Sequence, residues 1–131
     1  MIALDTNVAV RLLVRDDLAQ TARAAALVRN DDVLLTTTVL LEAEWVVLRS
    51  RYGVSRRLIH AGLRRLIDLD RLTVDQPTVA DRALDWFEAG MDFADALHLA
   101  SSAAATEFAT FDRKLGRQAT RLGAKPPIRL V

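Results

Sequence analysis

The chain has 131 residues without an internal repeat or a linker rich in proline, glycine or serine, so it fits one domain, residues 1–131, with a substantial core. It has no cysteine, which excludes disulfides, thiol catalysis and thiolate metal sites and directs any metal site towards magnesium or manganese. The formal net charge of +1 gives no bulk attraction to phosphate, so nucleic acid would have to be bound by local patches.

The first predicted element is a short buried strand. An apolar run over residues 2–4 is cut short by Asp5 and two small polar residues. A helix-like apolar run over residues 8–14 comes next, so Asp5 lies at a strand-to-helix junction, where open α/β sheets bind ligands. The alternative is that Asp5 or Thr6 merely caps this helix, as short polar residues do routinely.

Helices and strands alternate along the rest of the chain. Helices are expected over residues 18–28, 39 to about 52, 55–67, 77–90 and 92–104. Strands are expected over residues 33–37, 72–74, 107–111 and 128–131. We expect Thr38 to cap the helix at 39 and Gly53 to end it. The alternation implies a parallel sheet covered by helices on both faces, a three-layer α/β/α arrangement.

Four acids stand at comparable places. Asp5 and Asp112 come just after strands, Asp95 lies in the first turn of a helix, and Glu42 lies one turn into a helix that comes after a strand. Each has a structural explanation by itself, since Asp92 and Asp95 have the spacing of a capping pair and Asp112 can cap the segment after it. As a set they could converge at one sheet edge, where like charges repel unless a cation neutralises them.

A carboxylate site without cysteine suits Mg²⁺, which binds through a few carboxylates and the phosphates of its substrate. The matching chemistry is phosphoryl transfer, in which one or two metals, about 3.5–4 Å apart when paired, activate a water and stabilise charge on phosphate. The acids therefore predict a nuclease or a phosphatase.

The stretches that carry these acids resemble a known family. They are Leu-Asp-Thr-Asn at 4–7, Val-Leu-Leu-Glu at 39–42 with Trp45 and residues 48–53, the run 92–100, and Ala-Thr-Phe-Asp-Arg at 109–113. From residue 2 to about 113, the chain is similar to PIN-domain proteins of the VapC toxin type. Each stretch alone is a weak signal, but the four in this order are specific.

The resemblance implies about five parallel strands and a cytoplasmic, prokaryotic endoribonuclease that depends on Mg²⁺ or Mn²⁺. It also implies a homodimer and inhibition by a cognate VapB-like antitoxin. The residues that match the catalytic and metal-binding set are Asp5, Glu42, Asp95 and Asp112. The residues that match its supporting neighbours are Thr6, Asn7, Asp92 and Thr110, of which Asp92 is a support or a ligand.

Other candidates carry weaker signals. Glu44 lies about 200° round the helix from Glu42, so both cannot face one metal, and Glu42 is the choice. His98, one turn after Asp95, could approach a metal, although a histidine in an apolar helix more often packs. His60 is expected on the surface. Arginines that could steer RNA, bind an acidic antitoxin segment or simply form solvated helix faces are Arg49, Arg51, Arg56, Arg57, Arg64 and Arg65.

Two function classes remain open on the sequence alone. The first is a toxin ribonuclease, and the second is a non-catalytic nucleic-acid-binding or regulatory domain on the same scaffold. Within the enzyme class, phosphate chemistry does not separate RNA from DNA as the substrate. No apolar run approaches the roughly 20 residues of a membrane span, and no signal-like segment opens the chain, so a soluble protein is expected.

Overall fold

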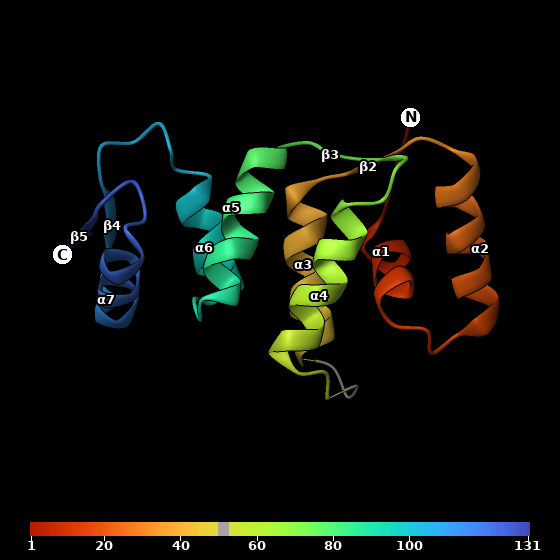
Figure 1. Ribbon diagram of the computed structural model, residues 1–131, viewed down its shortest axis with the longest axis horizontal. Coiled ribbons are helices and arrows are strands. Elements are labelled where there is room, and N and C mark those ends of the chain that lie inside the picture. The colour runs from red at the N-terminus through yellow and green to blue at the C-terminus, as the bar shows by residue number, and fades with distance from the viewer. Residues whose placement is uncertain (50–52) are drawn as a thin grey trace. The chain divides into compact units, whose positions relative to one another are not determined.

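The computed structural model describes residues 1–49 and 53–131, which form two compact units, residues 1–77 and 78–131. Each unit combines helices with parallel strands (Figure 1). The predicted α/β class with parallel strands is therefore confirmed. The strands of the described residues pair as a three-stranded and a two-stranded sheet, rather than as the single sheet of about five strands that was expected.

The first unit is built on three parallel strands in the order β1-β2-β3, namely β1 (Ile2–Ala3), β2 (Val33–Leu35) and β3 (Leu72–Val74). Their register places Val33 opposite both Ile2 and Leu72. The central strand is the most apolar of the three, and Val33 and Leu35 are both fully buried. A central parallel strand needs such a run because both of its faces are covered.

The helices of the first unit are α1 (Thr6–Leu13), α2 (Leu18–Asn30), α3 (Thr37–Arg49) and α4 (Arg56–Ile67). α1 packs against the other three. Helices α2 and α4 begin at side-chain caps, where Asp17 accepts a hydrogen bond from the Gln20 N–H and Ser55 accepts one from the Leu58 N–H. Such caps satisfy amide groups that a helix leaves unpaired at its first turn.

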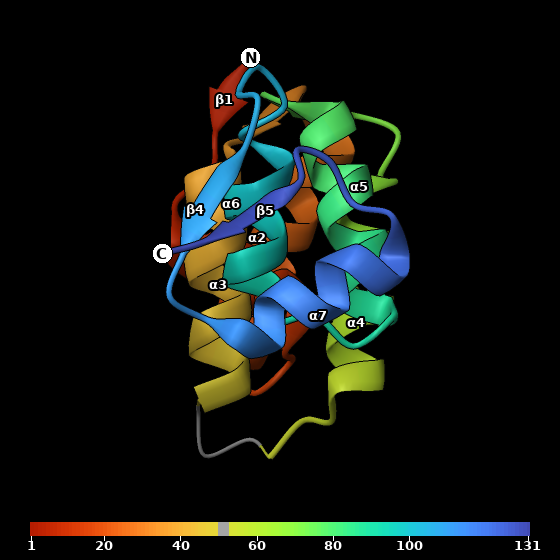
Figure 2. The same ribbon diagram turned by 90° about the vertical axis from the view of Figure 1, so that its left-hand side faces the viewer.

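The second unit contains α5 (Pro77–Glu88) from its second residue onward, α6 (Phe93–Ala100), β4 (Phe108–Thr110), α7 (Arg113–Leu122) and β5 (Ile128–Leu130). β4 and β5 are parallel, and α7 lies against β5 (Figure 2). The rings of Phe87 and Phe93 meet edge to face with centroids 5.4 Å apart, which joins the end of α5 to the start of α6.

The structure corrects the expected start of α3. The strand predicted over residues 33–37 ends at Leu35, and the helix begins at Thr37. The cap is Thr36 and not Thr38, because the Thr36 hydroxyl accepts a hydrogen bond from the Val39 N–H at 3.3 Å. The predicted continuation of this helix over residues 50–52 lies outside the described residues.

Two further differences concern the second unit. The helix predicted over residues 92–104 ends at Ala100, where the Ser102 hydroxyl bonds the His98 carbonyl oxygen at 2.8 Å and competes with the helical pattern. The helix α7 was not among the expected elements. It begins at the cap Asp112 and ends at Gly123, whose left-handed backbone (φ 64°) is the usual glycine C-terminus of a helix.

Candidate active site

Asp5 occupies the N-cap position of α1, but its carboxylate makes no capping hydrogen bond. The residue has extended backbone angles, and its carbonyl oxygen accepts the N–H groups of Val8 and Ala9. The side chain is exposed. The backbone therefore starts the helix while the carboxylate remains available for another purpose, which answers the capping alternative for this residue.

Thr6 connects Asp5 to the second predicted acid of the first unit. Its side chain is buried, at 7% exposure, and its hydroxyl donates a hydrogen bond of 2.9 Å to Glu42 Oε2 on α3. The structure thus brings Glu42 beside the residue directly after Asp5. A hydrogen bond to a carboxylate is stronger than one between neutral groups, so it fixes the direction of the Glu42 side chain.

The two glutamates of α3 face different ways. Glu42 is exposed, whereas Glu44 is buried at 3% exposure. This is the separation that the helical period predicts for residues two apart. Asn7 is exposed and lines a cavity of about 320 Å³ between α1 and α2, next to Val8 and Arg11. The structure therefore associates Thr6 with Glu42 and places Asn7 on the α2 side of the helix.

Asp75 is a carboxylate that the sequence analysis overlooked. It comes directly after β3, and its Oδ1 accepts a hydrogen bond of 2.8 Å from the Thr37 N–H at the start of α3. The neighbouring Gln76 side chain donates to the Thr37 hydroxyl oxygen at 3.3 Å. An aspartate immediately after a predicted strand, as at Asp5, was the signal that could have identified it. Its observed role is to tie the ends of two neighbouring strands together.

The predicted acids of the second unit lie at helix starts. Asp92 caps α6 by accepting the Asp95 N–H at 3.1 Å. Asp112 caps α7, since its Oδ1 accepts the Lys114 N–H at 2.9 Å and the Leu115 N–H at 3.1 Å. These capping roles, which the sequence offered as alternatives, are confirmed.

Thr110 holds the turn before α7 in place. Its hydroxyl oxygen accepts a hydrogen bond of 3.0 Å from the Asp112 N–H. Thr110 ends β4, so this contact sets the path of the chain from the strand to the carboxylate. Thr110 therefore positions Asp112 through its backbone N–H. Thr6, in contrast, binds a carboxylate oxygen of Glu42 directly.

The carboxyl group of Asp95 carries a raised pKa. The main cause is partial burial, which disfavours the charged form, and the negative charges of Asp92 and Asp112 raise the pKa further. His98, exposed on α6, acts in the opposite direction. Burial and two neighbouring negative charges therefore both disfavour the ionised form of Asp95, and a bound cation would offset that cost.

The residues available for a cation are oxygen donors, which suits Mg²⁺ or Mn²⁺. The repulsion at Asp95 fits such an ion. Among the described residues, however, no group of three or more acidic or histidine side chains is arranged to hold a metal. The carboxylates of each unit are thus suitable ligands for Mg²⁺ or Mn²⁺, but the described residues of neither unit provide three such ligands together.

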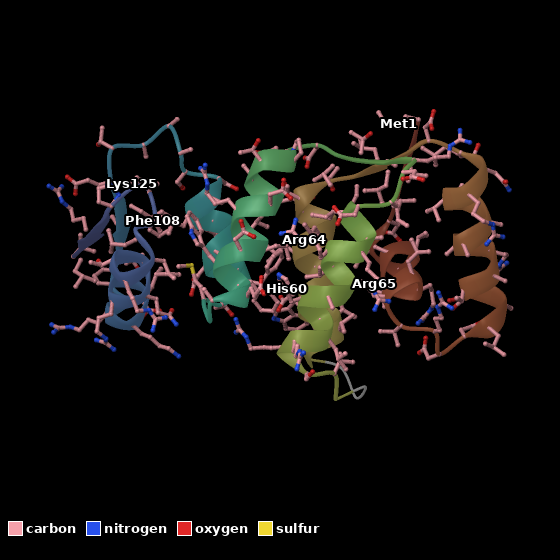
Figure 3. All side chains as sticks on the ribbon, viewed as in Figure 1. Met1, His60, Arg64, Arg65, Phe108 and Lys125 are labelled. Carbon is pink, nitrogen blue, oxygen red and sulfur yellow. The ribbon has the colours of Figure 1, made fainter. Side chains whose placement is uncertain are left out.

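Several weaker candidates can also be placed. His60, expected on the surface, is half-buried with its Nε2 atom inside, because α4 turns that face inward. It lies one turn from Arg64 on α4, and Arg65 lies on another face (Figure 3). Arg56, Arg57 and Arg65 are exposed. Arg51 and the side chain of Arg49 lie outside the described residues.

The fold and these carboxylates define an α/β protein with parallel strands, in which an aspartate stands within two residues after each of β1, β3 and β4. The chain matches the PIN domain family model over residues 2–120 and therefore belongs to the PIN-domain family. PIN domains have a nuclease-type fold and are generally metal-dependent nucleases that use Mg²⁺ or Mn²⁺. The comparisons with curated proteins and with solved structures gave no match.

None of the helices in the described residues is both long enough and apolar enough to cross a membrane.

Proposed function

We propose that the protein is a Mg²⁺- or Mn²⁺-dependent endoribonuclease and the toxin of a VapBC-like pair in a prokaryotic cytoplasm. Its catalytic and metal-binding residues are Asp5, Glu42, Asp95 and Asp112, supported by Thr6, Asn7, Asp92 and Thr110. The partners are RNA, a VapB-like antitoxin and a second copy of the chain. The observation that carries the enzyme proposal is the exposed carboxylate of Asp5, which makes no capping hydrogen bond and directly precedes Thr6, the residue whose hydroxyl orients the Glu42 carboxylate.

The reaction is hydrolysis of a phosphodiester. A water oxygen bonds to phosphorus, the bond from phosphorus to the leaving ribose oxygen breaks, and a proton reaches that oxygen. A bound Mg²⁺ or Mn²⁺ acidifies water and offsets the charge that develops on phosphate. The sequence contains no cysteine, and this route needs no protein nucleophile.

The chain's own contribution is to hold carboxylates in fixed directions before substrate arrives. Thr6 binds Glu42 Oε2, and both hydrogen bonds to the Asp112 carboxylate fall on Oδ1. Each acid therefore keeps an oxygen outside those bonds. Burial and the charges of Asp92 and Asp112 make an ionised Asp95 unfavourable in the folded protein, and a bound cation would offset that cost.

Cleavage of a labelled RNA by purified, antitoxin-free protein tests the proposal. Cutting is expected with Mg²⁺ or Mn²⁺ and is expected to stop in excess EDTA. Asp5→Asn should abolish it, because asparagine keeps the shape but removes the charge. Asp75→Asn is the matched control, since the amide oxygen can still accept the Thr37 N–H and cleavage should persist.

The alternative, a non-catalytic nucleic-acid-binding domain, is favoured by the lack of a three-residue metal group among the described residues. Binding of RNA without cleavage in either metal would support that alternative and reject the enzyme. Equal cutting in EDTA would reject metal dependence alone. The toxin role has its own test: expression of the chain should stop growth, and co-expression of the neighbouring antitoxin-like gene should restore it.

A further inference from the structure

Helix α7 concentrates positive charge in a protein of nearly balanced composition. Its ten residues include four basic side chains and no acid, whereas the whole chain has a net charge of +1. Arg113, Arg117 and Arg121 recur every four residues and so lie along one side of the helix. At 1.5 Å of rise per residue, they advance about 6 Å at each step and about 12 Å in total.

The three arginines line a groove formed by α7 and β5. The groove has a volume of about 540 Å³, and its apolar wall is Ile128 and Leu130. Gly116 faces this wall, and a Cβ added there would lie 3.4 Å from Leu130 Cδ2, an ordinary van der Waals distance. Leu130 is 51% exposed, so the groove is open to solvent at this end of β5.

These arginines have no counter-charge within the described part of the chain. None of the three forms a hydrogen bond or an ion pair there, whereas Arg71 pairs with Asp32 and Arg129 pairs with Glu107. Like charges four residues apart on a helix are destabilising. An unneutralised row of this kind favours an anion with several charges along its length.

An exposed aromatic ring stands at the start of the same helix. Phe111 is 85% exposed and directly precedes Asp112, the cap of α7 and a proposed catalytic acid. Aromatic rings beside a positively charged groove bind single-stranded nucleic acid, because any base can stack on the ring while its backbone tracks the charges.

We propose that α7 is the surface that holds the substrate backbone: phosphates of single-stranded RNA lie along Arg113, Arg117 and Arg121, and a base stacks on Phe111. This inference rests on the proposed nuclease function and identifies the surface on which that enzyme binds its substrate. Charge complementarity and continuity with Asp112 favour RNA over an acidic protein segment, which needs neither the aromatic ring nor the adjacent acid.

The test measures RNA binding separately from cleavage. Fluorescence anisotropy with a labelled, unstructured 20-nucleotide RNA in EDTA gives the affinity at several KCl concentrations. For single strands, each neutralised phosphate contributes about 0.7 to the slope of log affinity against log salt. The triple variant R113Q/R117Q/R121Q should therefore lower the magnitude of the slope by about 2, and Arg117→Gln alone by about 0.7.

The matched control is R15Q/R23Q/R29Q, which removes the same charge from exposed arginines of the first unit. Its slope should stay near that of the wild type. Phe111→Ala should weaken binding by about 5- to 150-fold without changing the slope, as expected for the loss of one stacked base. Glutamine is a good helix former, so the α7 variants should keep the wild-type melting temperature.

The inference would be overturned by an unchanged slope in the α7 variants, by an equal change in the control triple, or by normal RNA binding with loss only of an acidic protein partner. Failure of the enzyme proposal looks different. If the wild type binds RNA with a salt dependence that requires the α7 arginines but does not cut RNA with metal, the RNA-binding surface stands and the nuclease proposal fails. If the wild type cuts RNA and the α7 triple variant cuts it with the same KM, the nuclease stands and the surface is wrong.

Discussion

The hydrogen bond from Thr6 to Glu42 links the stability of the first unit to the proposed catalysis, and Thr6→Val tests the link. Valine keeps the branched shape of the buried side chain and removes only the donor to Glu42 Oε2. Without it, Glu42 loses the contact that fixes its direction. We expect cleavage to fall by up to on the order of 100-fold, the cost of a misplaced catalytic group.

The accompanying loss of stability should be small. A hydrogen bond to a charged group contributes about 1.5–3 kcal/mol, and the lower end applies because the exposed Glu42 carboxylate can turn to water. Unfolding entropy of about 2.1 cal/mol/K per residue over 131 residues converts about 1.5 kcal/mol to a decrease of roughly 5 °C in Tm. Scanning calorimetry and cleavage of labelled RNA measure the two effects on one preparation.

Two matched variants isolate the hydroxyl group. Thr6→Ser keeps the donor and should retain most of the activity. Thr21 has a buried hydroxyl with no hydrogen-bond partner in the described residues, so Thr21→Val should raise stability by about 1 kcal/mol, or roughly 4 °C, and leave cleavage unchanged. The reasoning is refuted if Thr6→Val cuts and melts like the wild type, or if Thr6→Ser is equally impaired.

Two further predictions concern the second unit. Asp112→Asn should keep the wild-type melting temperature, since asparagine caps helices as well as aspartate, but it should lose cleavage. Asp112→Ala should lose cleavage and also about 1 kcal/mol of stability. Full cleavage by the asparagine variant would show that Asp112 is not part of the active site. Because the pKa of Asp95 is raised in the folded protein, its contribution to stability is complete below the unfolded pKa of about 3.9 and is lost as pH rises through the folded pKa. The melting temperature of Asp95→Asn relative to the metal-free wild type should therefore increase across that interval, and Mg²⁺ should reduce the difference; a difference independent of pH would contradict the raised pKa of Asp95.

The elements most clearly predicted from sequence were those with local signals. Pro77 at the first turn of α5, Ser55 before α4 and the apolar run of β2 each act within a few residues, and these elements begin where they were expected. The pairing of strands was less predictable, because it depends on contacts between segments far apart in the chain. Nothing local in β4 or β5 determines which strands they join.

Helix α7 shows a different limit. Its mean composition is polar, and only three of its ten residues are buried: Leu115, Gly116 and Ala119. Its few apolar residues do recur on one face, as in a surface helix, but the segment contains no apolar run that would mark it as an element of the core. The start and stop signals at Asp112 and Gly123 were present, but Asp112 was interpreted as a possible ligand. The arginines that line the groove beside β5 were overlooked with the helix.

The same ambiguity affects all the acids, and the structure shows why capping and catalysis are not exclusive explanations. An aspartate that caps a helix accepts amide hydrogens with one oxygen, as Asp112 does with Oδ1, and the helix N-terminus stabilises its charged form. The cap therefore holds an ionised carboxylate rigidly at the end of an element while the other oxygen lies outside those bonds. Sequence spacing identifies the capping residue, but it cannot show what the second carboxylate oxygen binds. Only a change that keeps the cap and removes the charge separates the two roles, which is why asparagine at position 112, rather than alanine, is the decisive substitution.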